Sequence, residues 1–245
     1  MTAPTLTPAP MLVLAFPHAG ASATCYQPLA RALPSSFSWV THELPGRGTR
    51  LREPLRRTMA ALVDDAVERL HASFEQPYVL YGHSLGAWLA RDVAHKLREL
   101  GRRAPQGLFV SGRRGPSAPS TTQPLHDLPP QTFRQRLATW GGTPRAVLDD
   151  AELMEFFEPI LRADLEVLES CLPDRGPPLD VPIHVALGDE DDVTVEQARA
   201  WERESTRPIK ISSFSGGHFF IRDHAASLAG LIGAAFHASP NAAVP

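Results

Sequence analysis

Ser84 stands at the apex of a Gly-x-Ser-x-Gly pattern that runs from Gly82 to Gly86. An apolar run at residues 78–81 precedes the pattern, and an amphipathic stretch at residues 87–100 follows it. This order predicts a strand, a sharp turn and a helix, with the serine held in a strained backbone conformation at the turn. Side chains two residues away on either side would collide across such a turn, which explains the two glycines. A serine hydroxyl presented in this way is a nucleophile once a base lies within hydrogen-bond reach.

The base that we predict is His218, which comes after Ser84 in the chain. It follows a predicted strand at residues 209–214 and two turn glycines, Gly216 and Gly217. Loops at the carboxyl ends of parallel strands meet at one edge of a sheet, so His218 can lie near Ser84. The glycines leave the loop adaptable enough for the imidazole to project toward the serine.

The base needs a carboxylate that fixes its tautomer and stabilises the imidazolium. Three candidates, Asp189, Asp191 and Asp192, lie in one loop after a predicted strand at residues 181–187. The spacing Gly-x-x-Asp from Gly188 favours Asp191 as this acid, and Asp189 and Asp192 remain the alternatives. With Asp191 the chain order is Ser, Asp, His, which is the order of the α/β-hydrolases.

Attack by a serine on a carbonyl group places negative charge on oxygen, and two backbone N–H groups usually stabilise that charge. One donor is expected from Leu85, the residue after the nucleophile. The other is expected from the loop after the first strand, residues 17–21, where small residues let the main chain approach the oxyanion. We predict Ala19 as this second donor.

Three other reactive side chains lie near these motifs, and a structural role is favoured for each. His83 sits inside the Gly-x-Ser-x-Gly turn, where its side chain leaves the strand in another direction from the serine. For His18, in the loop at residues 17–21, a structural or substrate-contact role is favoured over that of a base. Cys25 has no comparable turn around it, which argues against a cysteine nucleophile.

A sheet has to position these residues, and the chain alternates short apolar runs with segments of helical periodicity. The alternation predicts an α/β protein of the α/β-hydrolase fold, with a mostly parallel sheet and helices on both faces. Strands are expected at residues 11–16, 38–43, 78–81, 107–111, 181–187 and 209–214, and helices at residues 26–33, 58–74, 85–100, 195–204 and 225–236.

Residues 113–175 interrupt this alternation, because they contain no good strand candidate. A stretch rich in proline, serine and threonine leads into one helix, expected at about residues 130–140. A second helix, from about residue 149, carries apolar residues at steps of three and four, and Pro159 should kink or divide it. The insertion lies between nucleophile and acid, where α/β-hydrolases carry theirs, so we predict a helical lid. The alternative is that these helices complete the core.

The chain has 245 residues, enough for one domain with a full core and one insertion. We predict a hydrolase domain at residues 11–238 between flexible tails at residues 1–10 and 239–245. A formal net charge of −3 argues against a nucleic-acid partner. No apolar run is long enough to span a membrane, and the amino-terminal residues do not resemble a signal peptide. With only two cysteines, which suggest a reducing compartment, we expect a cytoplasmic protein.

Short motifs besides the Gly-x-Ser-x-Gly turn and the loop from Gly188 to Asp191 run through nearly the whole chain. They are Phe16-Pro17-His18-Ala19-Gly20, Tyr26, Leu44-Pro45-Gly46-Arg47-Gly48 with Arg50 and Glu53, Ser111-Gly112-Arg113-Arg114, Gly141-Gly142-Thr143-Pro144, Arg162-Ala163-Asp164 and Gly216-Gly217-His218-Phe219. Together with the Gly-x-Ser-x-Gly turn, they resemble type II thioesterases, the discrete editing hydrolases of polyketide and nonribosomal peptide synthesis. Ala21 is a departure, because the family commonly has a second glycine there.

The resemblance implies hydrolysis of acyl groups from the phosphopantetheine thiol of carrier proteins, under a mobile helical lid. The partner is then an acyl or peptidyl carrier protein, and no metal or cofactor is needed. Carrier domains typically present an acidic helix, which a basic run at residues 47–57 would suit, although charge runs are usually only solvated.

Other functions remain open for the same residues. The triad would also serve a small-molecule carboxylesterase, or an acyltransferase that passes the acyl group to an amine or alcohol instead of water. A non-enzymatic module that binds carrier proteins is a further alternative. The complete set of Ser84, Asp191 and His218 speaks against it.

Overall fold

The computed structural model describes residues 9–119, 124–171 and 176–236 of the chain. The predicted tail at residues 239–245, and residues 1–8 of the predicted tail at the other end, lie outside this described part. So do residues 120–123 and 172–175 of the predicted insertion. Within the described ranges, no helix combines the length and the apolar character needed to cross a membrane.

Six strands form one sheet, and all neighbouring strands pair in parallel. They are β1 (Met11–Phe16), β2 (Phe37–Thr41), β3 (Tyr78–His83), β4 (Leu108–Ser111), β5 (Ile183–Gly188) and β6 (Lys210–Phe214). Their order across the sheet is β2-β1-β3-β4-β5-β6. Every strand predicted from the sequence is present, with ends that shift by a residue or two. The predicted α/β class with a mostly parallel sheet is therefore confirmed.

The strand β1 shows how the sheet separates two cores. All of its residues are buried. Its even-numbered residues, such as Leu14, belong to the core on one face, and its odd-numbered residues, such as Val13, belong to the core on the other. Successive side chains of a strand point to opposite faces, so a strand covered on both sides needs the continuous apolar run that the sequence has.

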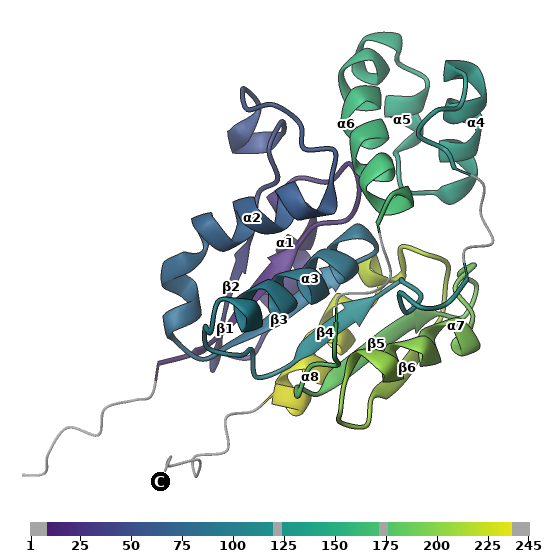
Figure 1. Cartoon of the computed structure of the whole chain (residues 1–245). Helices are drawn as coiled ribbons and strands as arrows, with labels where there is room; N and C mark the ends of the chain where they lie inside the picture. The colour runs from purple at the N-terminus through teal and green to yellow at the C-terminus, as the bar shows by residue number, and fades with distance from the viewer. Residues whose placement is uncertain (1–8, 120–123, 172–175, 237–245) are drawn as a thin grey trace, which may run out of the picture.

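Helices cover both faces of the sheet, as predicted (Figure 1). Outside the insertion they are α1 (Gln27–Ala32), α2 (Met59–Arg69), α3 (Leu85–Glu99), α7 (Val195–Arg199) and α8 (Ala225–Phe236). The helix α2 packs against α3 over one face, and α1 packs against α8 over the other. Short 3-10 helices extend several of these elements, at Ala23–Tyr26, Gly48–Arg50, His71–Glu75, Ala200–Glu204 and Phe220–Arg222.

The described part of the insertion contains three helices, which form a group at the top of the view in Figure 1. They are α4 (Pro130–Trp140), α5 (Arg145–Leu148) and α6 (Ala151–Glu169). The sequence did not predict α5, because a helix of one turn is too short to show a periodic pattern. The helix α6 runs through Pro159 without division. Proline removes only one backbone donor, and the apolar face of α6 stays buried on both sides of it.

The candidate residues gather where the chain changes its direction across the sheet. The strand β2 lies on one side of β1, and β3 lies on the other. Ligands of open α/β sheets bind at the carboxyl ends of the strands at such a point, because the loops diverge there. Ser84 follows β3, and the loop at residues 17–21 follows β1, so both lie at this point.

Candidate active site

Ser84 occupies a sharp turn between β3 and α3, as the sequence predicts. Its φ of 55° and ψ of −113° lie in a region that non-glycine residues avoid. No other non-glycine residue of the described chain has a positive φ. A Cβ atom on Gly82 would lie 2.0 Å from the Gly86 carbonyl oxygen, and one on Gly86 would lie 1.9 Å from the Phe16 carbonyl oxygen. The two glycines therefore permit the close backbone approach that this turn requires.

Hydrogen bonds to two neighbouring strands hold the turn. The Ser84 N–H donates to the carbonyl oxygen of Ser111, at the end of β4, at 2.9 Å. The buried hydroxyl of Tyr26 accepts from the His83 N–H at 3.2 Å and donates to the Phe16 carbonyl oxygen at 2.9 Å. Tyr26 thus ties the turn to the end of β1. The residues around Tyr26 in the sequence gave no sign of this supporting role.

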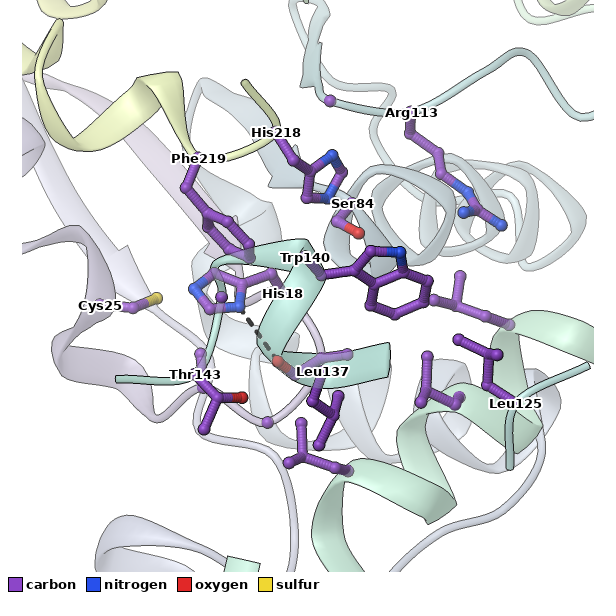
Figure 2. Close-up of a pocket in the computed structure, with 18 of the residues that line it drawn as sticks. His18, Cys25, Ser84, Arg113, Leu125, Leu137, Trp140, Thr143, His218 and Phe219 are labelled. Atoms are coloured by element: carbon purple, nitrogen blue, oxygen red, sulfur yellow. Dashed lines mark hydrogen bonds between the residues drawn. The ribbon is translucent and has the colours of Figure 1, made fainter. Parts of the chain in front are cut away.

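The structure brings His218 and Asp191 together. Nδ1 of His218 lies 2.9 Å from Oδ2 and 3.1 Å from Oδ1 of Asp191. The Asp191 side chain is only 3% exposed. This contact favours the tautomer with the proton on Nδ1 and leaves Nε2 as the nitrogen available to a hydroxyl. Figure 2 shows the Ser84 hydroxyl beside the His218 ring.

The two alternative acids occupy different surroundings. Oδ1 of Asp189 accepts the N–H of Gly216 at 2.9 Å, which steadies the loop that carries His218. Asp192 is exposed. Of the three candidate aspartates in this loop, Asp191 is the one in hydrogen-bond contact with the imidazole.

The two predicted oxyanion donors belong to segments that meet at Ser84. Leu85 is the first residue of α3, and the first N–H groups of a helix have no carbonyl partner within it. Ala19 belongs to the loop after β1 and lines the same cavity as Ser84 and His218. Ala19 thus borders the cavity at Ser84, and Leu85 follows the serine directly.

Two further histidines lie near His218, with His83 packed against its ring and His18 packed against His83, and both are neutral near pH 7. Burial lowers the pKa of His18 to about 4 and lowers the pKa of His83 well below its usual value. The His83 and His218 ring centroids lie 4.9 Å apart, and Nδ1 of His83 lies 3.0 Å from the Ser111 hydroxyl oxygen. These contacts agree with the packing role expected for His83, and the place of His18 in the cavity wall agrees with the structural or substrate-contact role expected for it.

A cavity of about 650 Å³ opens at Ser84 and extends beneath the insertion. Leu137 and Trp140 of α4 line it, together with Leu161 and Leu165 of α6. Figure 2 shows Trp140 close to Ser84 in this view and Leu137 further from His218. The sequence showed Leu161 and Leu165 as apolar positions of the second helix, but it did not assign any of these four residues to a cavity wall. A largely apolar wall of this kind suits an apolar substrate chain.

Arg113, just after β4, places a cation in the same wall. Its guanidinium carbon lies 4.0 Å from the centroid of the Trp88 ring, and burial lowers its pKa to about 9. Within the described residues its Nε has no hydrogen-bond partner. The neighbouring Arg114 instead donates to the Ala118 carbonyl oxygen. Stacking on Trp88 therefore fixes the Arg113 cation at the cavity.

Cys25 also lines the cavity, but it is not an activated thiol. Burial raises the pKa of the Cys25 thiol to about 12, so the thiol stays protonated near pH 7. A cysteine nucleophile requires a lowered pKa. The environment of Cys25 therefore argues against a role as nucleophile, as the sequence does.

The basic run at residues 47–57 is only partly available to a partner. Arg47 and Arg50 are buried. Arg47 pairs with Asp164 and Arg50 pairs with Asp65, so these two arginines act inside the fold. The other arginines of the run are exposed.

A parallel sheet with a strained serine between a central strand and its following helix defines an α/β-hydrolase. A family model described as a thioesterase domain matches residues 12–236, which include the sheet, the insertion and all three triad candidates. The chain belongs to the thioesterase family, and its relatives identify it as a type II thioesterase.

Three of these relatives show how far the similarity extends. The protein named "Probable cadicidin biosynthesis thioesterase" from Streptomyces griseus is 34% identical over 236 residues, which make up 95% of this chain and 64% of that protein. Gramicidin S biosynthesis protein GrsT from Aneurinibacillus migulanus is 32% identical over 214 residues, 87% of this chain and 84% of GrsT. The structure of the type II thioesterase BorB from the borrelidin biosynthetic cluster matches with a TM-score of 0.84 and 34% identity, over 96% of this chain and 94% of that one.

Proposed function

We propose that this thioesterase releases acyl groups from the phosphopantetheine thiol of acyl or peptidyl carrier proteins, as an editing enzyme of polyketide or nonribosomal peptide synthesis. The observation that carries the proposal is the contact of His218 with Asp191 in the cavity that also holds the strained Ser84. Together these residues provide an oriented base, His218, and a nucleophile, Ser84, in a chamber with largely apolar walls. Two relatives support the pathway, since GrsT is named for gramicidin S biosynthesis and BorB for the borrelidin cluster.

The first half of the proposed reaction transfers the acyl group to the enzyme. Oγ of Ser84 attacks the thioester carbonyl carbon, while Nε2 of His218 takes the hydroxyl proton and Asp191 stabilises the resulting imidazolium. The N–H groups of Leu85 and Ala19 donate to the oxyanion. The tetrahedral intermediate then breaks its carbon–sulfur bond, and the departing thiol receives the proton from His218.

The second half releases the acid and restores the enzyme. Water gives a proton to Nε2 of His218 and attacks the acyl ester on Ser84. The same two N–H groups stabilise the second oxyanion. The carbon–oxygen bond to Ser84 breaks, the serine regains its proton, and a free carboxylic acid leaves. Apart from the attacking water, protein residues supply the groups that act in these two half-reactions.

Hydrolysis rates on matched thioester and ester substrates test this function against a small-molecule carboxylesterase. We expect kcat/KM to be at least roughly 10-fold higher for an acyl-pantetheine than for the nitrophenyl ester of the same acyl group, because the pantetheine arm adds binding energy away from the reacting bond. A preference for the nitrophenyl ester would favour the carboxylesterase. If amine or alcohol acceptors divert the product from free acid to amide or ester, the enzyme is an acyltransferase.

We also propose that the insertion at residues 113–175 is the lid of the chamber. Its described helices α4 and α6 supply part of the wall, and Trp140 is both a wall residue and partly exposed. We expect amide exchange in α4 and α5 to be faster than in the strands and to slow when a non-hydrolysable acyl-pantetheine binds. Slow exchange that the ligand leaves unchanged would assign these helices to a rigid core instead.

We further infer a cytoplasmic location. Cys25 is a free thiol, which is typical of a reducing compartment. Cell fractionation tests this inference, and recovery of the native protein outside the cytoplasm would contradict it.

A further inference from the structure

The loop after β1 contains one peptide unit that is held at both ends. The Ala19 carbonyl oxygen lies 3.1 Å from Nδ1 of His18, the dashed line in Figure 2. A carbonyl oxygen can only accept, so this nitrogen carries the proton. The N–H of Gly20, in the same peptide unit, donates to Oδ2 of Asp164 at 2.7 Å. Because a peptide unit is planar, the two bonds together set its orientation and that of the adjoining Ala19 backbone.

Asp164 reaches this loop from α6, 144 residues further along the chain than Gly20. Its side chain is completely buried and also forms a two-bond ion pair with Arg47. Nη1 of Arg47 lies 2.5 Å from Oδ2, and Nη2 lies 2.8 Å from Oδ1. A buried carboxylate is costly unless it is paired and hydrogen-bonded, and here it is both. Arg47 thus neutralises and orients the group that accepts from Gly20.

Packing joins α6 to the same loop residue. Gly20 has a φ of +76°, and a Cβ atom there would lie 2.5 Å from Cδ2 of Leu161. Leu161 and Asp164 are three residues apart on α6, so they share one side of that helix. One turn of α6 therefore covers Gly20 with Leu161 and accepts its N–H with Asp164.

We propose that Asp164 is a positioning residue for catalysis, which holds the Gly20 N–H and thereby keeps the neighbouring Ala19 N–H directed at the oxyanion. This inference rests on the proposed function, in which Ala19 is an oxyanion donor. Asp164 belongs to the insertion, whereas the donor belongs to the sheet domain. The oxyanion hole is therefore complete only while this turn of α6 lies against the loop after β1.

Loss of the Asp164 contact would misplace the Ala19 donor without removing it. A displacement of about 1 Å in a catalytic arrangement costs about 100-fold in rate. Binding of the acyl chain before reaction depends on the chamber wall, and Asp164 is not among the described residues that line it. Loss of this contact should therefore lower kcat and the affinity for tetrahedral analogues, and it should change KM little.

Two double variants separate the hydrogen bond to Gly20 from the ion pair. Arg47→Met with Asp164→Asn removes the charges and keeps an acceptor oxygen. Arg47→Met with Asp164→Leu removes the acceptor as well, at similar volume and with no charge left buried. We expect kcat on acyl-pantetheine to be roughly 10- to 100-fold lower for the leucine variant than for the asparagine variant. An acyl-pantetheine trifluoromethyl ketone forms a tetrahedral adduct with Ser84, and the affinity for it should fall by the same factor. The affinity for an unreactive thioether analogue should stay the same in both variants.

The pair formed by Arg50 and Asp65 supplies the matched control. It is also buried and bidentate, with Nη1 to Oδ2 at 2.7 Å and Nη2 to Oδ1 at 2.6 Å, and Asp65 makes no contact with the loop after β1 among the interactions described. Asp65→Asn should lower the melting temperature and leave the ratio of ketone to thioether affinity at the wild-type value. A positioning role for Asp164 changes that ratio, whereas a purely structural role changes only the melting temperature.

Three results would overturn the inference. Equal kcat values for the leucine and asparagine variants would show that the Gly20 contact is irrelevant to the rate. Equal losses of ketone and thioether affinity would show that the chamber itself is deformed. A wild-type enzyme that does not hydrolyse acyl-pantetheine would overturn the proposed function and this inference with it. In the first two cases the wild-type enzyme still hydrolyses acyl-pantetheine. A failure of the inference about Asp164 can therefore be distinguished from a failure of the proposed function.

Discussion

Ser84→Ala is expected to lower kcat on acyl-pantetheine by about 10⁴-fold or more, since the proposed covalent route has no other nucleophile. The substitution removes only the oxygen, and alanine must adopt the same strained φ of 55° that serine already tolerates. KM should therefore change little, and the melting temperature should stay near that of the wild type. Steady-state kinetics and thermal unfolding of the two proteins provide the comparison.

Covalent labelling gives the nucleophile a direct test. A fluorophosphonate probe followed by peptide mass spectrometry should place the adduct on Ser84 in the wild type and yield no adduct in Ser84→Ala. Cys25 is the built-in control, because it lines the same cavity with a protonated thiol. An adduct on Cys25, or an alanine variant with nearly full activity, would contradict the assignment.

Asp191→Asn should have the second largest effect, a loss in kcat on the order of 10³- to 10⁴-fold. The amide has nearly the same shape, but it cannot stabilise an imidazolium, and its NH₂ group favours the wrong His218 tautomer. The contact at 2.9 Å that now orients the ring would then hold it in an inactive form. The loss should appear equally in acylation and deacylation, which single-turnover kinetics can separate.

The two neighbouring carboxylates are matched controls for Asp191. Asp192 is exposed, so Asp192→Asn should leave kcat within a few-fold of the wild type. Asp189→Asn keeps the oxygen that accepts from Gly216, so it should also be mild. If Asp189→Asn proved the most damaging of the three, the contact between Asp191 and His218 would not be the catalytic one.

Local patterns were sufficient to predict the fold and the triad candidates. The strand β1 is buried on both faces, and such a strand reads as a continuous apolar run. Gly82 and Gly86 mark the turn around Ser84 because a Cβ atom at either position would meet backbone. The Gly-x-x-Asp spacing selected the carboxylate that contacts His218, since the loop after β5 is short and its geometry is local.

The contacts that support the site could not be predicted in the same way. The bond from Gly20 to Asp164 joins residues 144 positions apart. In the sequence, Arg162-Ala163-Asp164 is only one of the motifs of the family resemblance, and nothing in it predicts that the Asp164 side chain is completely buried. Similarly, Arg47 and Arg50 read as members of an exposed basic run, and both are inside the fold. Pairing across the structure decides such cases, and a single sequence carries no record of it.

Pro159 lies between two parts of the continuous helix α6 that make different contacts. The half after it includes Leu161 and Asp164 and is tied to the reaction machinery, so substitutions there would affect the rate of catalysis. The half before it carries exposed Leu153 and Phe156. Proline donates no hydrogen bond to the preceding turn, so a bend at this position breaks fewer bonds than elsewhere in the helix. Of the α6 residues that line the chamber, Phe157 lies before Pro159, so a substitution there could change the acyl groups admitted while Leu161 and Asp164 keep their places at Gly20.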